Sequence, residues 1–93
     1  MIIGTLMFEL YLPGISSLKE KRFILKSLKD KTRNHFNVSI AEIDHLDKWQ
    51  RCGLGIACVS NSRRHLDSML SKITAYLEKD SRFEIIDQVT EIF

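Results

Sequence analysis

Four stretches of the chain have the pattern of β-strands, in which alternate residues share a face. Residues 2–12 place Gly4, Leu6, Phe8, Leu10 and Leu12 on one side. Residues 37–44 are rich in β-branched residues, and residues 51–60 alternate in the same way. Residues 82–93 predict the last strand, although the adjacent Ile85 and Ile86 indicate a bulge or an uncertain register there.

Two further stretches have the period of an amphipathic helix. Ser16 or Ser17 is expected to cap the first helix, which runs to about His35 with an apolar side made of Leu18, Ile24, Leu25, Leu28 and Phe36. Ser60, Asn61 or Ser62 is expected to cap the second. Its apolar stripe consists of Leu66, Met69, Leu70, Ile73 and Leu77.

The order β-α-β-β-α-β predicts one α+β domain, residues 1–93, with a ferredoxin-like plait. We expect a four-stranded antiparallel sheet with the first and third strands in the centre and both helices on one face. The other face is then bare. It would display Thr5, Met7, Glu9, Tyr11, Gly53, Gly55, Ala57 and Val59, with Ala41 and Ile43 beside them.

Composition narrows the class of protein without giving a function. The 93 residues are 44% hydrophobic with a net charge of +2, which excludes a disordered chain and a collagen-like fibre. Cys52 and Cys58 are about 20 Å apart along one strand, too far for a disulfide, so we expect free thiols in a reducing cytoplasm. The apolar start of the chain is too short to span a membrane and contains Glu9, so we expect neither a signal peptide nor a membrane anchor.

Charge is distributed very unevenly. Residues 16–33 contain seven basic and two acidic residues, a net charge of +5 that leaves −3 for the rest of the chain. Five of the cations fall within an arc of about 80° and along about 21 Å of the first helix. We call this set the basic stripe: Lys19, Arg22, Lys26, Lys29 and Arg33.

The basic stripe has two possible interpretations, a solvated helix face or a binding surface for an anion. Most charged helix faces only interact with solvent, but such faces usually mix signs at a spacing of four residues. Here Arg22/Lys26 and Lys29/Arg33 are like-charged pairs, and Lys19 lies near the positive end of the helix dipole. An anion would relieve this repulsion, and a row of cations of this length could follow a phosphate backbone, so an anionic partner is favoured slightly over a solvated face.

Other candidate sites near the first helix are weaker. Lys21 lies one turn before the core stripe, and we expect its stem to pack on the sheet while its amine reaches water. Residues 13–17 lead into the helix N-terminus and could hold one anion. They lack the Gly-x-Val-Gln-Gly-Val-x-x-Arg pattern of acylphosphatases, so phosphatase chemistry is not expected.

No constellation of catalytic or metal-binding residues can be named. Glu42, Asp44, His45 and Asp47 gather where the second strand ends, but carboxylates are common in polar hairpin loops. His35 and His65 have no suitably spaced partners. We therefore predict a protein that is not an enzyme and that needs no cofactor or metal.

The bare sheet face and Trp49 are candidate protein contacts. The segment 51–56 repeats the glycine spacing of an RNA-recognition motif, but Leu54 and Ile56 stand at its stacking positions and point inward. A face of small and apolar residues suits a homodimer or a protein partner better. Trp49 either covers the end of the core or anchors a partner.

Three ordered motifs closely resemble the YlxP family, a small bacterial family of unknown function. They are Ser17-Leu18-Lys19-Glu20-Lys21-Arg22, the segment Phe36-Asn37-Val38-Ser39-Ile40-Ala41-Glu42, and Asp47-Lys48-Trp49-Gln50-Arg51. The resemblance spans the chain and implies a ferredoxin-like cytosolic protein with no assigned catalytic residue. Genes of this family commonly lie beside those for transcription elongation, translation initiation and ribosome-binding factor A, which implies a role in translation or ribosome maturation.

The motif positions carried over by this resemblance are Leu18, Lys19, Lys21, Arg22, Asn37, Ser39, Glu42, Asp47, Trp49, Gln50 and Arg51. Lys19 and Arg22 belong to both the motifs and the basic stripe. Two hypotheses follow: binding to RNA or the small ribosomal subunit through the basic stripe, or a dimeric interaction module that uses the open sheet face.

Overall fold

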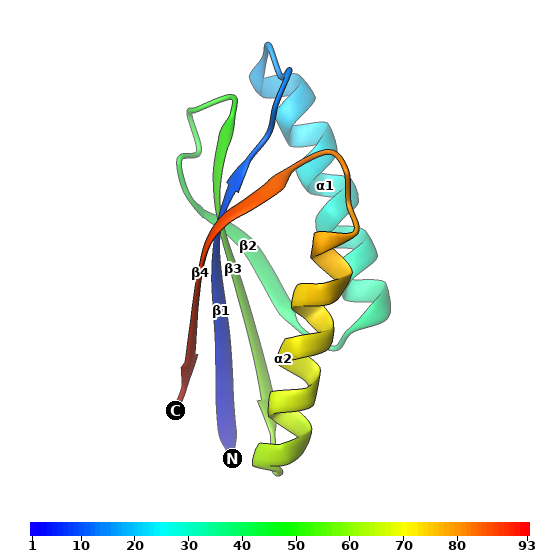
Figure 1. The fold of residues 1–93 in the computed structure, drawn as a ribbon, viewed down its shortest axis with the longest axis vertical. Coiled ribbons are helices and arrows are strands. Elements are labelled where there is room, and N and C mark those ends of the chain that lie inside the picture. The colour runs from blue at the N-terminus through cyan, green and yellow to red at the C-terminus, as the bar shows by residue number, and fades with distance from the viewer.

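The computed structural model describes residues 1–93 and confirms the predicted order of elements. The elements are β1 (Ile2–Tyr11), α1 (Leu18–His35), β2 (Ser39–Asp44), β3 (Arg51–Ser60), α2 (Arg63–Glu78) and β4 (Glu84–Ile92). The strands form one antiparallel sheet in the order β2-β3-β1-β4, so β1 and β3 are central as expected. Both helices cover the same face of the sheet and the other face is bare (Figure 1). The fold is the predicted ferredoxin-like plait.

Alternation along the central strands builds the core. Every second residue of β1 from Leu6 is buried, and so is every second residue of β3 from Cys52 to Cys58. The apolar stripe of α2 packs onto them, with Met69 half-buried at its margin. Gly4 permits this packing, because a Cβ there would lie 3.0 Å from Leu66 of α2.

The buried side of α1 differs from the expected one. Lys21, Leu25, Leu28 and Thr32 form its centre, whereas Leu18, Ile24 and Phe36 are only half-buried. Two polar residues can occupy the centre because each finds hydrogen-bond partners inside the protein. The Thr32 hydroxyl donates to the Leu28 carbonyl at 2.7 Å, and Lys21 is described below.

Two of the outer strands are shorter than predicted. β2 begins at Ser39 because residues 36–38 make a turn, in which the Val38 amide donates to the Phe36 carbonyl. β4 begins at Glu84 because Asp80 and Arg82 close a turn before it. The N-cap residues of the two helices are Ser17 and Ser62, and each is among the candidates that the sequence predicted.

The expected bulge in β4 is confirmed. Glu9 pairs with Asp87 and the next residue, Leu10, pairs with Ile85, so Ile86 is the extra residue. A second irregularity lies between β2 and β3, where Glu42 pairs with Leu54 and Asp44 pairs with Gly53. Ile43 is the extra residue there.

The chain termini and the predicted motif segments lie mostly at opposite ends of the molecule (Figure 1). The chain termini lie at one end, while the β2–β3 loop and the start of α1 lie at the other (Figure 1). Residues 2 and 3 of β1 are therefore far from the segments in which most of the motif residues occur.

Candidate nucleic-acid interface

The start of α1 is closed by its own side chains. The Ser17 hydroxyl accepts from the Glu20 amide at 3.2 Å, and the Glu20 carboxylate accepts from the amide and hydroxyl of Ser16. This is a form of capping box. The carboxylate of Glu20 thus occupies the place that an anion would take at residues 13–17, so the loop offers no ready anion site.

The basic stripe follows the flank of α1 next to the edge strand β2. Arg33 marks this flank, because its Nη2 donates to the Ile40 carbonyl at 3.0 Å. Lys31 points about 160° away from Arg33 around the helix axis, and it lines a hollow together with Tyr76 of α2. The stripe is therefore on the side of α1 that α2 leaves uncovered.

One carboxylate serves two members of the basic stripe. Asp30 accepts from Lys26 at 2.9 Å and lies 3.7 Å from Arg33. The hydrogen bond from Lys26, with Lys26, Arg33 and Lys29 nearby, lowers the pKa of Asp30 below its usual value. Lys19, Arg22 and Lys29 form no ion pair within the protein.

The expectation that the Lys21 amine reaches water is wrong. The Lys21 side chain is 1% exposed, and its Nζ donates to the carbonyls of His45 and Lys48, each at 2.6 Å. It also forms an ion pair with Glu42 Oε2 at 2.6 Å. The ammonium can be buried because two carbonyls accept its hydrogen bonds and the Glu42 carboxylate compensates for its charge.

Glu42 depends on this contact in turn. Its Oε2 atom is buried and has no hydrogen-bond donor in good geometry, so the adjacent ammonium is what compensates for its charge. Lys21 and Glu42 come from two separate family motifs, and the fold brings them together. Their contact joins α1 to β2 and to the loop that follows β2.

The β2–β3 loop is ordered by several further contacts. His45 adopts a left-handed backbone conformation with φ of 60°, and its amide donates to the side chain of Asp44. Its ring Nε2 lies 2.9 Å from Glu9, which also accepts from Arg51 at 3.0 Å. Gln50 reaches the Ile15 carbonyl at the start of α1.

The acidic residues near this loop do not form a metal centre. Glu42 faces Lys21 and His45 faces Glu9, on opposite sides of the sheet. No group of three or more His, Cys, Asp or Glu side chains has a geometry suited to a metal ion.

The remaining motif residues divide into two places. Asp47 and Trp49 lie in the loop, and both are exposed. Trp49 is 51% exposed and lies outside the hydrophobic core, so it does not cover the end of the core. Asn37 and Ser39 are exposed at the opposite end of β2 and make no side-chain hydrogen bond.

The open sheet face carries an apolar hollow of about 500 Å³. Residues that were expected on this face are confirmed there, with one qualification at the glycines. Asp44 covers Gly53 and Ile43 covers Gly55, so the two glycines are less accessible than expected. The large exposed apolar side chains of the sheet are Met7, Ile43, Val59, Ile86 and Val89, with Phe93 after β4.

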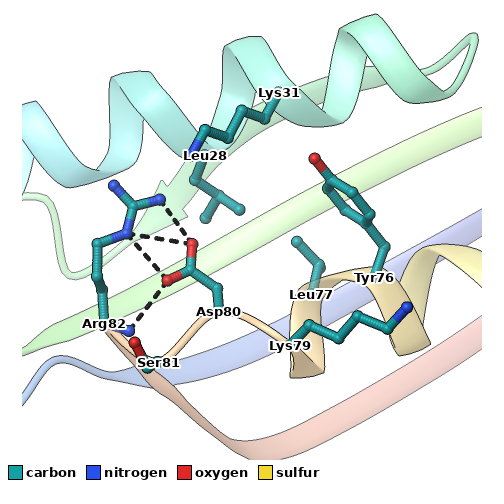
Figure 2. Close-up of a pocket in the computed structure, with 8 residues that line it drawn as sticks. All are labelled: Leu28, Lys31, Tyr76, Leu77, Lys79, Asp80, Ser81 and Arg82. Carbon is teal, nitrogen blue, oxygen red and sulfur yellow. Dashed lines mark hydrogen bonds and ion pairs between the residues drawn. The ribbon is translucent and has the colours of Figure 1, made fainter.

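A second hollow, of about 350 Å³, lies between α1 and the turn that follows α2 (Figure 2). Asp80 and Arg82 face each other at its side, with a closest contact of 2.6 Å. The hydrogen bond from Arg82 holds the pKa of Asp80 below its usual value and raises that of Arg82. These two charges therefore neutralise each other and hold the turn.

Sequence reasoning missed one surface residue, Phe23. It is 75% exposed on α1 although the fold buries most other large apolar side chains of the helices. Its position four residues after Lys19 and three before Lys26 could have drawn attention to it, because such neighbours share a helix surface.

Neither helix of the structure is long and apolar enough to cross a membrane.

Comparison with known proteins gives two matches that agree. Residues 3–90 match the family described as protein of unknown function, DUF503. The chain is also 39% identical, over 92 residues, to the uncharacterized protein YlxP of Bacillus subtilis (strain 168). This alignment covers 99% of the chain and 100% of the relative.

Proposed function

The chain belongs to the DUF503 family, and we propose that it is a non-enzymatic cytoplasmic RNA-binding protein that associates with small-subunit ribosomal RNA. The proposal rests on one observation above all. Lys19, Arg22 and Lys29 share one flank of α1 and have no ionic partner in the protein.

The distribution of charge across the molecule supports this surface over the sheet. β4 contains Glu84, Asp87 and Glu91 and no basic residue, and it is the edge strand farthest from β2. Phosphates would be repelled from that side and attracted to the basic stripe. An RNA-recognition mode on the bare sheet face is disfavoured, because Arg51 is paired with Glu9 there and the tyrosine of that face, Tyr11, is half-buried.

The test measures binding of a labelled small-subunit ribosomal RNA fragment at two salt concentrations. A triple variant, Lys19→Glu with Arg22→Glu and Lys29→Glu, is expected to lose at least tenfold in affinity. The dependence of log K on log salt should also become less steep by about 2 to 3, because each lost phosphate contact contributes about 0.7 to 0.9.

The matched control makes the same change of net charge on α2 and the turn beyond it: Arg64→Glu with Lys72→Glu and Lys79→Glu. These residues are exposed and lie away from the stripe. An equal loss of affinity in both variants would show a general effect of net charge and would contradict the proposal. Binding that does not depend on salt would contradict it as well.

A second candidate function is a dimeric interaction module, and the apolar open face favours it. The four strands present an area of roughly 550 Å² at ordinary strand spacing. A standard interface takes about 800 Å² from each partner, so a dimer of standard size would bury the whole face together with residues at its margin. Val59 is 57% exposed near one end of the face and Met7 is near its middle.

Sedimentation of the wild-type protein over a range of concentrations tests the dimer. Self-association that Met7→Lys or Val59→Lys abolishes would support it, and Lys72→Glu on the helix side is the control. A monomer at the highest concentration would eliminate this candidate. RNA binding by the basic stripe does not depend on its outcome.

A further inference from the structure

Phe23 has no structural role that accounts for its position. A phenylalanine stabilises a protein mainly through the area that it buries, and this one leaves 75% of its surface in solvent. Phenylalanine is also a poorer helix former than alanine or lysine. An exposed aromatic side chain in the middle of the second turn of α1 therefore suggests that something else contacts it.

The surroundings of Phe23 combine apolar surface with positive charge. Ile15, Phe23 and Ile24 line a shallow hollow of about 400 Å³, which Lys19 and Glu20 border. On the helix surface, Lys19 is one turn before Phe23 and Lys26 is about one turn after it. Glu20 is held by Ser16 and Lys26 is paired with Asp30, which leaves Lys19 as the charged group beside the ring with no partner in the protein.

We infer that the basic stripe binds single-stranded RNA, with an unpaired base stacked on Phe23 and the phosphate backbone along the stripe. This inference rests on the proposed function and specifies the class of its ligand. An aromatic ring beside cations is the usual means of binding single strands without sequence preference, because every base has a face that can stack. A duplex offers phosphates but keeps its bases stacked on each other, so it would make no use of Phe23.

Trp49 is a second exposed aromatic side chain, in the loop that Lys21 holds to α1. The Lys21 ammonium holds the carbonyl of Lys48, the residue before Trp49, against α1.

The experiment compares a labelled 12-nucleotide single-stranded RNA with a duplex of the same sequence, by fluorescence anisotropy at two salt concentrations. The wild-type protein is expected to bind the single strand more tightly. Phe23→Ala should weaken single-strand binding about tenfold and leave duplex binding unchanged. The salt dependence should be the same as in the wild type, because no charge is removed.

A spectroscopic variant reads the stacking directly. Phe23→Trp in a Trp49→Phe background places the only tryptophan of the chain at the hollow. Its fluorescence should be quenched by the single strand and its affinity should match that of the single variant Trp49→Phe. Val59→Ala removes exposed apolar surface from the sheet face, away from α1, and serves as the control.

The outcomes separate this inference from the proposed function. If RNA binds with salt dependence but Phe23→Ala changes nothing, or if single strand and duplex bind equally, the stacking is overturned while the basic stripe keeps its role. If the tryptophan at position 23 is not quenched, the stacking is overturned too. If neither RNA binds, both conclusions fail, and Phe23 is left as a contact for a protein. Because Phe23 is so exposed, both variants are expected to fold.

Discussion

Lys21 joins three segments of the chain through one ammonium group. It lies on α1, forms an ion pair with Glu42 of β2, and holds two carbonyls of the β2–β3 loop. A buried ion pair contributes little net stability when it is intact, but its removal from one side leaves an uncompensated charge. The effect of substitution should therefore be large.

We expect Lys21→Met to lower the free energy of unfolding by about 3 kcal/mol. The methionine keeps the apolar stem but leaves the Glu42 carboxylate without its counter-charge and two carbonyls without their donor. Urea denaturation measures the loss, and hydrogen exchange should show faster exchange in residues 45–50. Lys31→Met, an exposed lysine on the same helix, should change stability by less than about 0.5 kcal/mol. A loss below 1 kcal/mol for Lys21→Met would mean that the three contacts do not hold the loop.

Cys52 is a second buried side chain with a measurable consequence. Both cysteines are free and buried, as the sequence predicted. Burial, together with the nearby charge of Glu42, raises the pKa of the Cys52 thiol to about 12 from an ordinary value of 9.0. The thiol should therefore be inert to alkylating reagents in the folded protein at pH 8.

The same shift makes stability depend on pH in the alkaline range. Above about pH 9 the unfolded state loses the Cys52 proton while the folded state keeps it, so stability falls as the pH rises towards 12. We expect up to about 1.4 kcal/mol per pH unit from this group. Other groups titrate in this range, so the measurement is the difference between wild type and Cys52→Ala in unfolding free energy at pH 8 and pH 10.5. A difference that does not change with pH would contradict the shift.

At the scale of elements, the β2–β3 hairpin depends on a close approach over Gly53. A Cβ at this position would lie 2.6 Å from the Asp44 Cβ and 3.2 Å from the Asp44 backbone. At Gly55 the nearest atom is 3.1 Å away and belongs to the flexible side chain of Ile43. The two glycines therefore differ in how far their surroundings can adjust.

We expect Gly53→Ala to destabilise the protein by about 2 kcal/mol, within the range for overpacking, and Gly55→Ala to cost less. Thermal unfolding of the two variants gives the comparison. Because Asp44 precedes His45, displacement of Asp44 should also disturb the contact between His45 and Glu9. An equal or greater cost at Gly55 would show that the approach over Gly53 is not the tighter one.

The elements themselves could be predicted because their signals are local. Alternation defined β1 and β3, serine caps limited the helices, and the doubled isoleucine located the bulge at Ile86. The centre of α1 could not be predicted, because a lysine is buried only when distant acceptors meet it. Those acceptors, at residues 42, 45 and 48, come from another part of the chain.

At the scale of the whole molecule, the basic stripe could be predicted from helical periodicity. Which of its cations have an ionic partner within the protein could not. The sequence indicates five cations on one flank, and the structure divides them into two that share Asp30 and three with no ionic partner. The exposure of Phe23 could not be predicted for a related reason. Whether an aromatic side chain of an amphipathic helix is buried depends on where the neighbouring helix and the sheet lie.

Net charge also differs between the two edges of the sheet. α1 carries a net charge of +5 near the β2 edge, and β4 carries −3 at the other edge. A polyanion is therefore expected to meet the molecule in one orientation, with α1 towards it and β4 away. Long-range attraction of this kind raises the rate of association more than it lowers the rate of dissociation.

The pairing of the first strand with the last has a consequence for synthesis of the chain. β1 is central and is flanked by β3 on one side and by β4 on the other, and the Phe93 amide donates to the Ile3 carbonyl at 2.8 Å. A nascent chain is made from its N-terminus. One edge of β1 therefore stays unpaired until β4, at the end of this sequence, has been translated. Folding of the complete sheet is thus a late, nearly all-or-none event, and a chain interrupted before Glu84 presents an open strand edge that is prone to aggregation.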